Sequence, residues 1–120
     1  MQSLLVFNSD DRPFAVEPVA HILQSENGFR DMRFNEPGGA AIEAVYDQID
    51  DYTIVRLTGD RETISLSGTT DAALRAVLIL QRRLPGPLRI IDTDYSFDLA
   101  LGGFASIEEL RAAINSAHAG

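Results

Sequence analysis

Residues 40–68, AAIEAVYDQIDDYTIVRLTGDRETISLSG, decide the fold because they hold the clearest strand signals in the chain. At their start, Ile42, Ala44 and Tyr46 alternate with Glu43, Val45 and Asp47. This is the period of a strand with one buried face. Apolar residues also recur at helical spacing as far as Ile49, so a helix fits the same residues. We choose the strand.

Two further strands are expected directly after this one. The runs at 52–58 and 62–67 are rich in β-branched residues, which favour strands. Between them, Gly59-Asp60-Arg61 forms a good short hairpin loop. Together these signals predict an antiparallel meander.

The remaining elements surround this meander. Pro18 is tolerated only in the first turn of a helix, and Ser106 with Glu109 matches the capping-box pattern at the start of the last helix. Residues 69–71 supply hydroxyls and an acid that suit the start of the middle helix. The expected elements are strands at 3–8, 29–34 and one or two within 89–103, and helices at 17–24, 72–84 and 106–117.

This order of elements predicts an α+β fold. We expect a mainly antiparallel sheet of about five to seven strands, with three helices packed on one face. No internal repeat or long linker divides the chain, so residues 1–120 are predicted to form a single globular domain.

The stretch at 89–103, RIIDTDYSFDLALGG, places acids among large apolar residues. In an unbroken strand Tyr95 and Phe97 would face the core, and Asp92, Asp94 and Asp98 would face solvent. A hairpin turn at Asp92-Thr93-Asp94 would suit the acids equally well, because aspartate side chains bond local backbone amides. Both layouts explain the acids without a catalytic role.

The composition excludes several classes of function. The chain has no cysteine, so it has no disulfide, thiolate nucleophile or cysteine-based zinc site. A net charge of −8 argues against binding to nucleic acid and favours a basic partner. All ten basic residues are arginine, which is typical of a GC-rich bacterial genome. With no apolar run long enough to span a bilayer, we expect a cytoplasmic protein that binds no membrane.

Charge is unevenly distributed along the sequence. Residues 36–62 hold seven acids and two arginines, a net charge of −5, whereas residues 69–91 have a net charge of +3. Tyr46 and Tyr52 lie within the acidic segment, and tyrosine is a residue type that anchors interfaces. We therefore expect the middle of the chain to form an acidic face that binds a partner.

Signals for catalysis are weak. The two histidines, His21 and His118, are far apart, and His21 is expected to be a half-buried packing residue. No serine nucleophile elbow or phosphate-binding glycine loop is present, so we predict neither an enzyme nor a cofactor.

The alternative is a small metal-dependent hydrolytic enzyme that uses Asp92 and Asp94. A third hypothesis is a homodimeric structural protein, because Ile79 is expected on the polar side of its helix beside Arg75 and Arg82.

The second half of the chain resembles a known group of proteins. Residues 62–84, ETISLSGTTDAALRAVLILQRRL, and 92–114, DTDYSFDLALGGFASIEELRAAI, are similar to small acidic bacterial immunity proteins of polymorphic toxin and contact-dependent inhibition systems. Many of these proteins end in a strand pair, a short SIEEL-type cap and a last helix. The resemblance implies a protein that blocks a secreted toxin by binding it, often with acids against a basic surface.

The leading hypothesis is therefore a non-enzymatic protein-binding module, an immunity or inhibitor protein whose acidic face neutralises a cationic partner. The residues expected to bind this partner are Glu43, Asp47, Asp50, Asp51, Asp92, Asp94 and Asp98.

Overall fold

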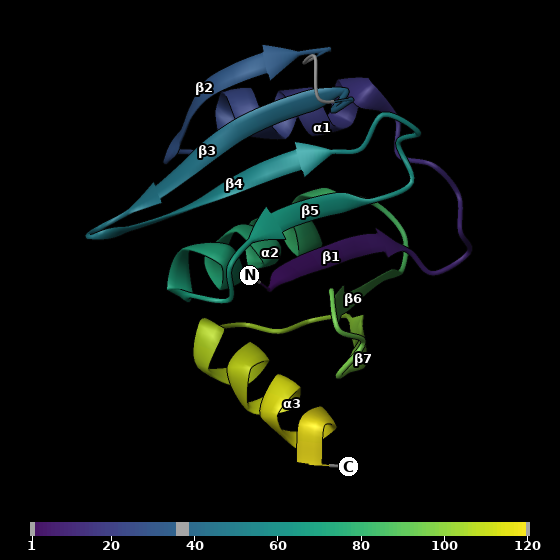
Figure 1. The fold of residues 1–120 in the computed structure, drawn as a ribbon, viewed down its shortest axis with the longest axis vertical. Helices are drawn as coiled ribbons and strands as arrows, with labels where there is room; N and C mark the ends of the chain where they lie inside the picture. Colours follow the sequence, from purple (N-terminus) through teal and green to yellow (C-terminus); the bar gives the residue numbers. More distant parts are fainter. Residues whose placement is uncertain (1, 36–38, 120) are drawn as a thin grey trace.

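A computed structural model describes residues 2–35 and 39–119 of the chain, with side chains as far as residue 117. Its strands form one seven-stranded sheet in the order β2-β3-β4-β5-β1-β6-β7, and every neighbouring pair is antiparallel. The α+β fold predicted from the sequence is confirmed (Figure 1). The elements are β1 Ser3–Asn8, α1 Val16–Ser25, β2 Phe29–Phe34, β3 Ile42–Gln48, β4 Asp51–Leu57, β5 Ile64–Ser67, α2 Asp71–Arg83, β6 Leu88–Asp92, β7 Asp98–Leu101 and α3 Ile107–Ala119.

The helices cover one face of this sheet. α1 contacts β2 and β3, α2 contacts β3, β4 and β5, and α3 lies against α2 and β7. In Figure 1, α1 and α2 lie behind the strands, so the opposite face of the sheet turns toward the viewer. In β1, for example, Leu4 and Val6 are buried beneath the helices, whereas Leu5 and Phe7 on the other face are half-buried. Among the described helices, none is both long and apolar enough to cross a membrane.

Residues 40–68 fold as the meander β3-β4-β5. Ile42, Ala44 and Tyr46 are buried, as the strand alternation predicts, and Ile49 is 93% exposed in the turn after β3. In the helical alternative, Ile49 would share a buried face with Ile42 and Tyr46. In the observed strand Ile49 lies beyond the last residue of β3, so it does not have to be buried. The choice of a strand is confirmed.

The stretch at 89–103 is a hairpin and not one unbroken strand. β6 ends at Asp92, which is 1% exposed, and its carboxylate accepts hydrogen bonds from the backbone N–H of Ser96, at 2.7 Å, and from the Ser96 hydroxyl. These bonds close a turn in which Tyr95 has a φ of 54° and is 75% exposed. The predictions that Asp92 faces solvent and that Tyr95 faces the core were wrong, while Phe97 is buried as expected.

Three local predictions have different outcomes. The Ser106 cap of α3 is confirmed, because Ser106 Oγ accepts from the N–H of Glu109 at 3.2 Å, while the Glu109 carboxylate accepts from the N–H of Ala105, one residue before the cap, at 2.7 Å. His21 is exposed and not half-buried. Ile79 was expected to be exposed but is 7% exposed and belongs to the core, because elements distant in sequence lie beside this part of α2.

Candidate functional site

The uncovered side of the sheet, called here the open face, is formed by the alternate residues that point away from the helices. On β1 and β6 the paired residues Leu5 and Ile91 lie side by side across the strands. On β3 and β4 the pair Val45 and Ile54 does the same. No described helix covers this face, and Leu5, Val45 and Ile54 are half-buried there, while Ile91 is buried between its neighbours. An exposed apolar region on a sheet is a common feature of interaction sites.

A hollow of about 390 Å³ lies on this face over β1 and β6. Its lining combines apolar residues from both strands with the exposed ring of Tyr95 and two carboxylates from neighbouring loops. We call it the open-face hollow; it is lined by Leu5, Phe7, Asp11, Glu62, Thr63, Ile91 and Tyr95. Asp11 and Glu62 pair with no basic side chain among residues 2–35 and 39–117. The hollow therefore presents uncompensated negative charge beside apolar surface.

Three of the acids predicted to bind a partner, Glu43, Asp47 and Asp98, also lie on the open face, but each forms an ion pair with an arginine. Asp47 pairs with Arg30. Asp98 accepts from Arg89 Nη2 at 2.6 Å. Their charges are consequently offset within the chain, which weakens the field that each presents to a partner.

The third pair, Glu43 with Arg56, differs in geometry. Arg56 Nε lies 2.8 Å from Glu43 Oε1, but the N–H is not aimed well enough to count as a hydrogen bond. The contact is therefore an electrostatic one. Arg33 of β2 stands opposite Glu43 on its other side, so this acid is flanked by arginine positions on both neighbouring strands.

Asp51 has a structural role that the sequence analysis missed. Its Oδ2 accepts from the N–H of Ala72 and its Oδ1 accepts from the hydroxyl of Thr70, both at 3.0 Å. The hydrogen bond from Ala72, reinforced by the one from Thr70, holds the pKa of Asp51 below its ordinary value. Asp51 thus caps α2 from the start of β4, whereas a hydroxyl cap was expected from residues 69–71 and the N-cap residue Thr70 forms no side-chain cap hydrogen bond.

The remaining predicted acids differ in exposure and lie in two separate turns. Asp50 is exposed in the turn between β3 and β4, and Asp92 is buried in the hairpin turn described above. Asp94 is exposed, and its Oδ2 accepts from Gln2 Nε2 at 2.6 Å. The seven predicted acids therefore do not form one continuous acidic face.

The metal hypothesis finds no support in this arrangement. Asp92 and Asp94 lie in the same turn, but Asp92 is occupied by bonds to Ser96. Within the part of the chain that the structure describes, no group of three or more metal-ligating side chains comes together. His118 has a side chain outside the described residues.

A comparison of the chain with protein-family models, with curated proteins and with solved structures found no match in any of the three. The site must therefore be interpreted from its own geometry.

Sequence reasoning missed the open-face hollow because its lining comes from four separate segments. Neither Asp11 nor Glu62 was among the acids expected to bind a partner, although Glu62 was counted in the acidic run at 36–62. The one usable signal was Phe7, an aromatic residue on the side of β1 opposite the buried Leu4 and Val6. The sheet order, with β1 between β5 and β6, is what brings these residues together.

Proposed function

We propose that this chain is a non-enzymatic protein-binding module that binds a basic partner at its open face. The observation that carries the proposal is the open-face hollow, in which the carboxylates of Asp11 and Glu62, which form no ion pair with a described basic residue, adjoin apolar side chains. A lysine or arginine side chain combines an aliphatic stem with a cationic end. Such a side chain matches the two kinds of surface in this hollow.

The exposed ring of Tyr95 adds to this match. A cation near the face of a tyrosine ring gains about 0.5–1 kcal/mol at an exposed site. Leu5 and Phe7, both half-buried, offer apolar surface to the stem, and the two carboxylates can each accept hydrogen bonds from the cationic end. The overall charge of −8 favours the approach of a basic protein and makes its association sensitive to salt.

The specific form of the proposal is an immunity or inhibitor protein that acts in the bacterial cytoplasm. It is supported by the resemblance of residues 62–84 and 92–114 and by the acidic composition. Glu43, Asp47 and Asp98 would then take part by exchanging their arginine partners for groups of the bound protein. Asp92 and Asp51 are left out of the proposed surface, since both carboxylates are held within the fold.

A tetra-arginine peptide is a defined probe for this site. Titrated against the labelled protein, it should shift the amide NMR signals around Leu5, Ile91 and Tyr95 in a saturable and salt-sensitive way. The double variant Asp11→Asn/Glu62→Gln should weaken this binding about tenfold, since two charge-assisted hydrogen bonds are lost. The matched control, Asp50→Asn/Glu108→Gln, removes the same charge at exposed residues that do not line the hollow, and it should bind much as the wild type does.

Two results would contradict the proposal. In one, the two double variants weaken binding equally, which would mean that only net charge matters. In the other, light scattering shows a dimer and the amide NMR signals of Leu5 and Tyr95 change on dilution, which would favour the homodimer hypothesis. If the controls behave as expected, the same two double variants can be coupled to a support to capture the native partner. The control variant should retain this partner, and the variant Asp11→Asn/Glu62→Gln should not.

A further inference from the structure

A groove of about 710 Å³ lies on the helical side of the molecule, remote from the open face. We call it the α2 groove. Its walls come from the end of α1, from β3, from α2 and from the segment before α3. The lining residues are Ser25, Glu26, Asn27, Tyr46, Arg75, Leu78, Ile79, Gln81, Arg82, Gly103, Phe104 and Ala105. Its volume is typical of sites that bind small molecules.

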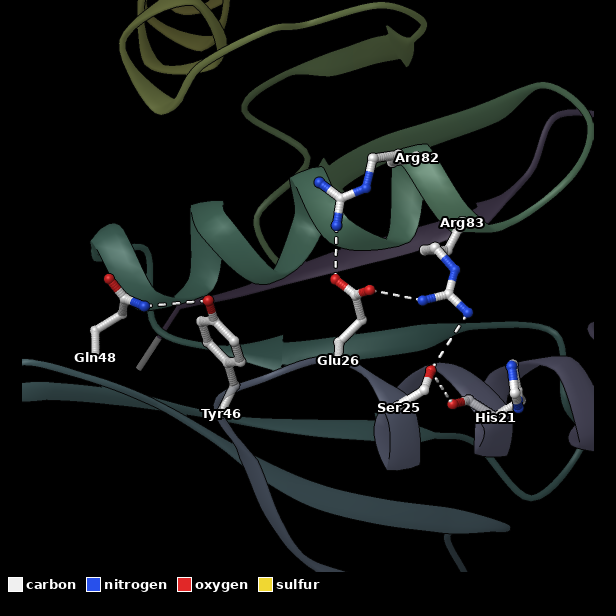
Figure 2. A network of polar contacts seen from close by, with 7 residues as sticks. All are labelled: His21, Ser25, Glu26, Tyr46, Gln48, Arg82 and Arg83. Carbon is white, nitrogen blue, oxygen red and sulfur yellow. Dashed lines mark hydrogen bonds and ion pairs between the residues drawn. The ribbon is translucent and has the colours of Figure 1, made fainter.

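The charge around this groove is opposite to that of the whole protein. Figure 2 shows Glu26 held between two arginines of α2, with its Oε1 accepting from Arg82 Nη2 and its Oε2 from Arg83 Nη1, both at 2.6 Å. Both carboxylate oxygens are thus occupied, and one negative charge faces two positive ones. Arg75 adds a third positive charge and forms no ion pair or hydrogen bond with any described residue.

A second unused donor lies in the same groove. Tyr46 is 4% exposed, and its Oη accepts from Gln48 Nε2 at 3.1 Å (Figure 2). Among the described residues, no acceptor receives the hydroxyl hydrogen of Tyr46. Burial raises the pKa of Tyr46, so the hydroxyl keeps its hydrogen at neutral pH, although the nearby charge of Arg75 opposes this shift. Tyr46 and Arg75 are therefore donors from different elements for which no described residue supplies an acceptor.

The rest of the lining is apolar and held in place. Leu78, Ile79 and Phe104 contribute hydrocarbon surface. The side-chain amide of Gln81 bonds both backbone groups of Phe104, donating to its carbonyl at 2.9 Å and accepting from its N–H at 3.2 Å. These two bonds fix the segment before α3 against α2. The apolar wall is consequently preformed, which lowers the entropic cost of binding.

We propose that the α2 groove binds a small organic anion, in which a carboxylate or phosphate is attached to an apolar group about the size of a ring. The anionic oxygens accept from Arg75 and from the Tyr46 hydroxyl, and the apolar group contacts Ile79 and Phe104. A cation is disfavoured by the three arginines, and an inorganic anion leaves the apolar wall unused. This inference does not depend on the proposed function, because the open-face hollow shares no residue with this groove.

Benzoate and phenyl phosphate are suitable probes, measured by amide NMR titration of the whole chain. Each should produce saturable shifts around Tyr46, Arg75 and Phe104, with a dissociation constant on the order of 1 mM for the better one. The probe that binds more tightly identifies the anionic group. Benzylammonium, which has a ring of similar size and the opposite charge, should not bind there, and inorganic phosphate should bind much more weakly than phenyl phosphate.

Variants then assign the donors. Arg75→Gln should weaken binding at least about tenfold, and Tyr46→Phe, which keeps the ring, should weaken it roughly threefold to tenfold. Arg12→Gln removes the same charge from an arginine outside the groove and should change nothing. The proposal is overturned if neither probe gives saturable shifts, if benzylammonium or inorganic phosphate binds as well, or if Arg75→Gln and Arg12→Gln behave alike.

Discussion

The substitution Gly28→Ala adds one methyl group beside Tyr46, so it tests how tightly this ring of the α2 groove is packed. The φ of Gly28 is +102°, in the left-handed region, and a Cβ atom added there would lie 2.8 Å from Cε1 of Tyr46. The Tyr46 ring has little room to move, because it is buried and its centroid lies 4.7 Å from that of Phe29. Gly28→Ala therefore combines backbone strain with a steric clash against a packed ring.

Gly103 separates these two costs. Its φ is +94°, close to that of Gly28, but a Cβ atom there would meet nothing within 4 Å. Gly103→Ala should lose only the backbone term, about 1–2 kcal/mol of the free energy of unfolding. Gly28→Ala should lose a further 1–3 kcal/mol or so, the usual cost of overpacking, for a total of about 2–5 kcal/mol.

Urea denaturation followed by circular dichroism measures both values. The near-ultraviolet tyrosine signal should change in Gly28→Ala and stay as it is in Gly103→Ala, since only the former displaces the Tyr46 ring. Equal losses of stability in the two variants would refute the reasoning, because they would show that the Tyr46 ring moves aside without any cost in free energy.

Three further predictions concern single side chains. Asp51→Asn should lower the stability at neutral pH, and its difference from the wild type should disappear on acidification below 3.8, the ordinary pKa of aspartate. The reason is that the folded-state pKa of Asp51 is lowered, so its contribution to stability is present above 3.8 and is lost as pH falls through the folded-state pKa. Asp50→Asn, measured by the same pH series of urea titrations, should show no such pattern. Ile79→Ala should cost about 2–4 kcal/mol in urea denaturation, whereas Ile49→Ala, at a position 93% exposed, should change stability by less than about 0.5 kcal/mol. Asp92→Ala should cost roughly 1–3 kcal/mol, because it leaves a hydrogen-bond donor of the hairpin turn unsatisfied, and thermal unfolding measures the loss.

The elements that could be predicted are those whose signals are local. The first strand was placed at 3–8, where β1 lies, because a short apolar run there ends in a turn-forming sequence. The Ser106 cap of α3 was recognised because Ser106 and Glu109 lie within one helical turn. The meander of β3, β4 and β5 was recognised because β-branched residues, alternation and a short loop all indicate the same structure.

The failures share a different cause, which is contact between segments distant in sequence. Ile79 lies beside two arginines along its helix, yet Glu26 and Tyr46 line the same groove and help to bury it. The cap of α2 comes from Asp51, which precedes Ala72 by 21 residues, so no pattern within the helix could reveal it. The burial of Asp92 likewise depends on where β6 stops, and the alternation alone gave no end to that strand.

Charge was the feature for which sequence reasoning was least adequate. The acidic run at 36–62 suggested one acidic face, but the antiparallel pairing places Arg30 against Asp47 and Arg56 against Glu43. Acids that are crowded in sequence are thus separated or neutralised on the sheet. Asp11 and Glu62 lie 51 positions apart and still line one hollow, because β1 runs beside β5. A binding surface in this protein is therefore better located by asking which charges lack a partner than by asking where charges are dense.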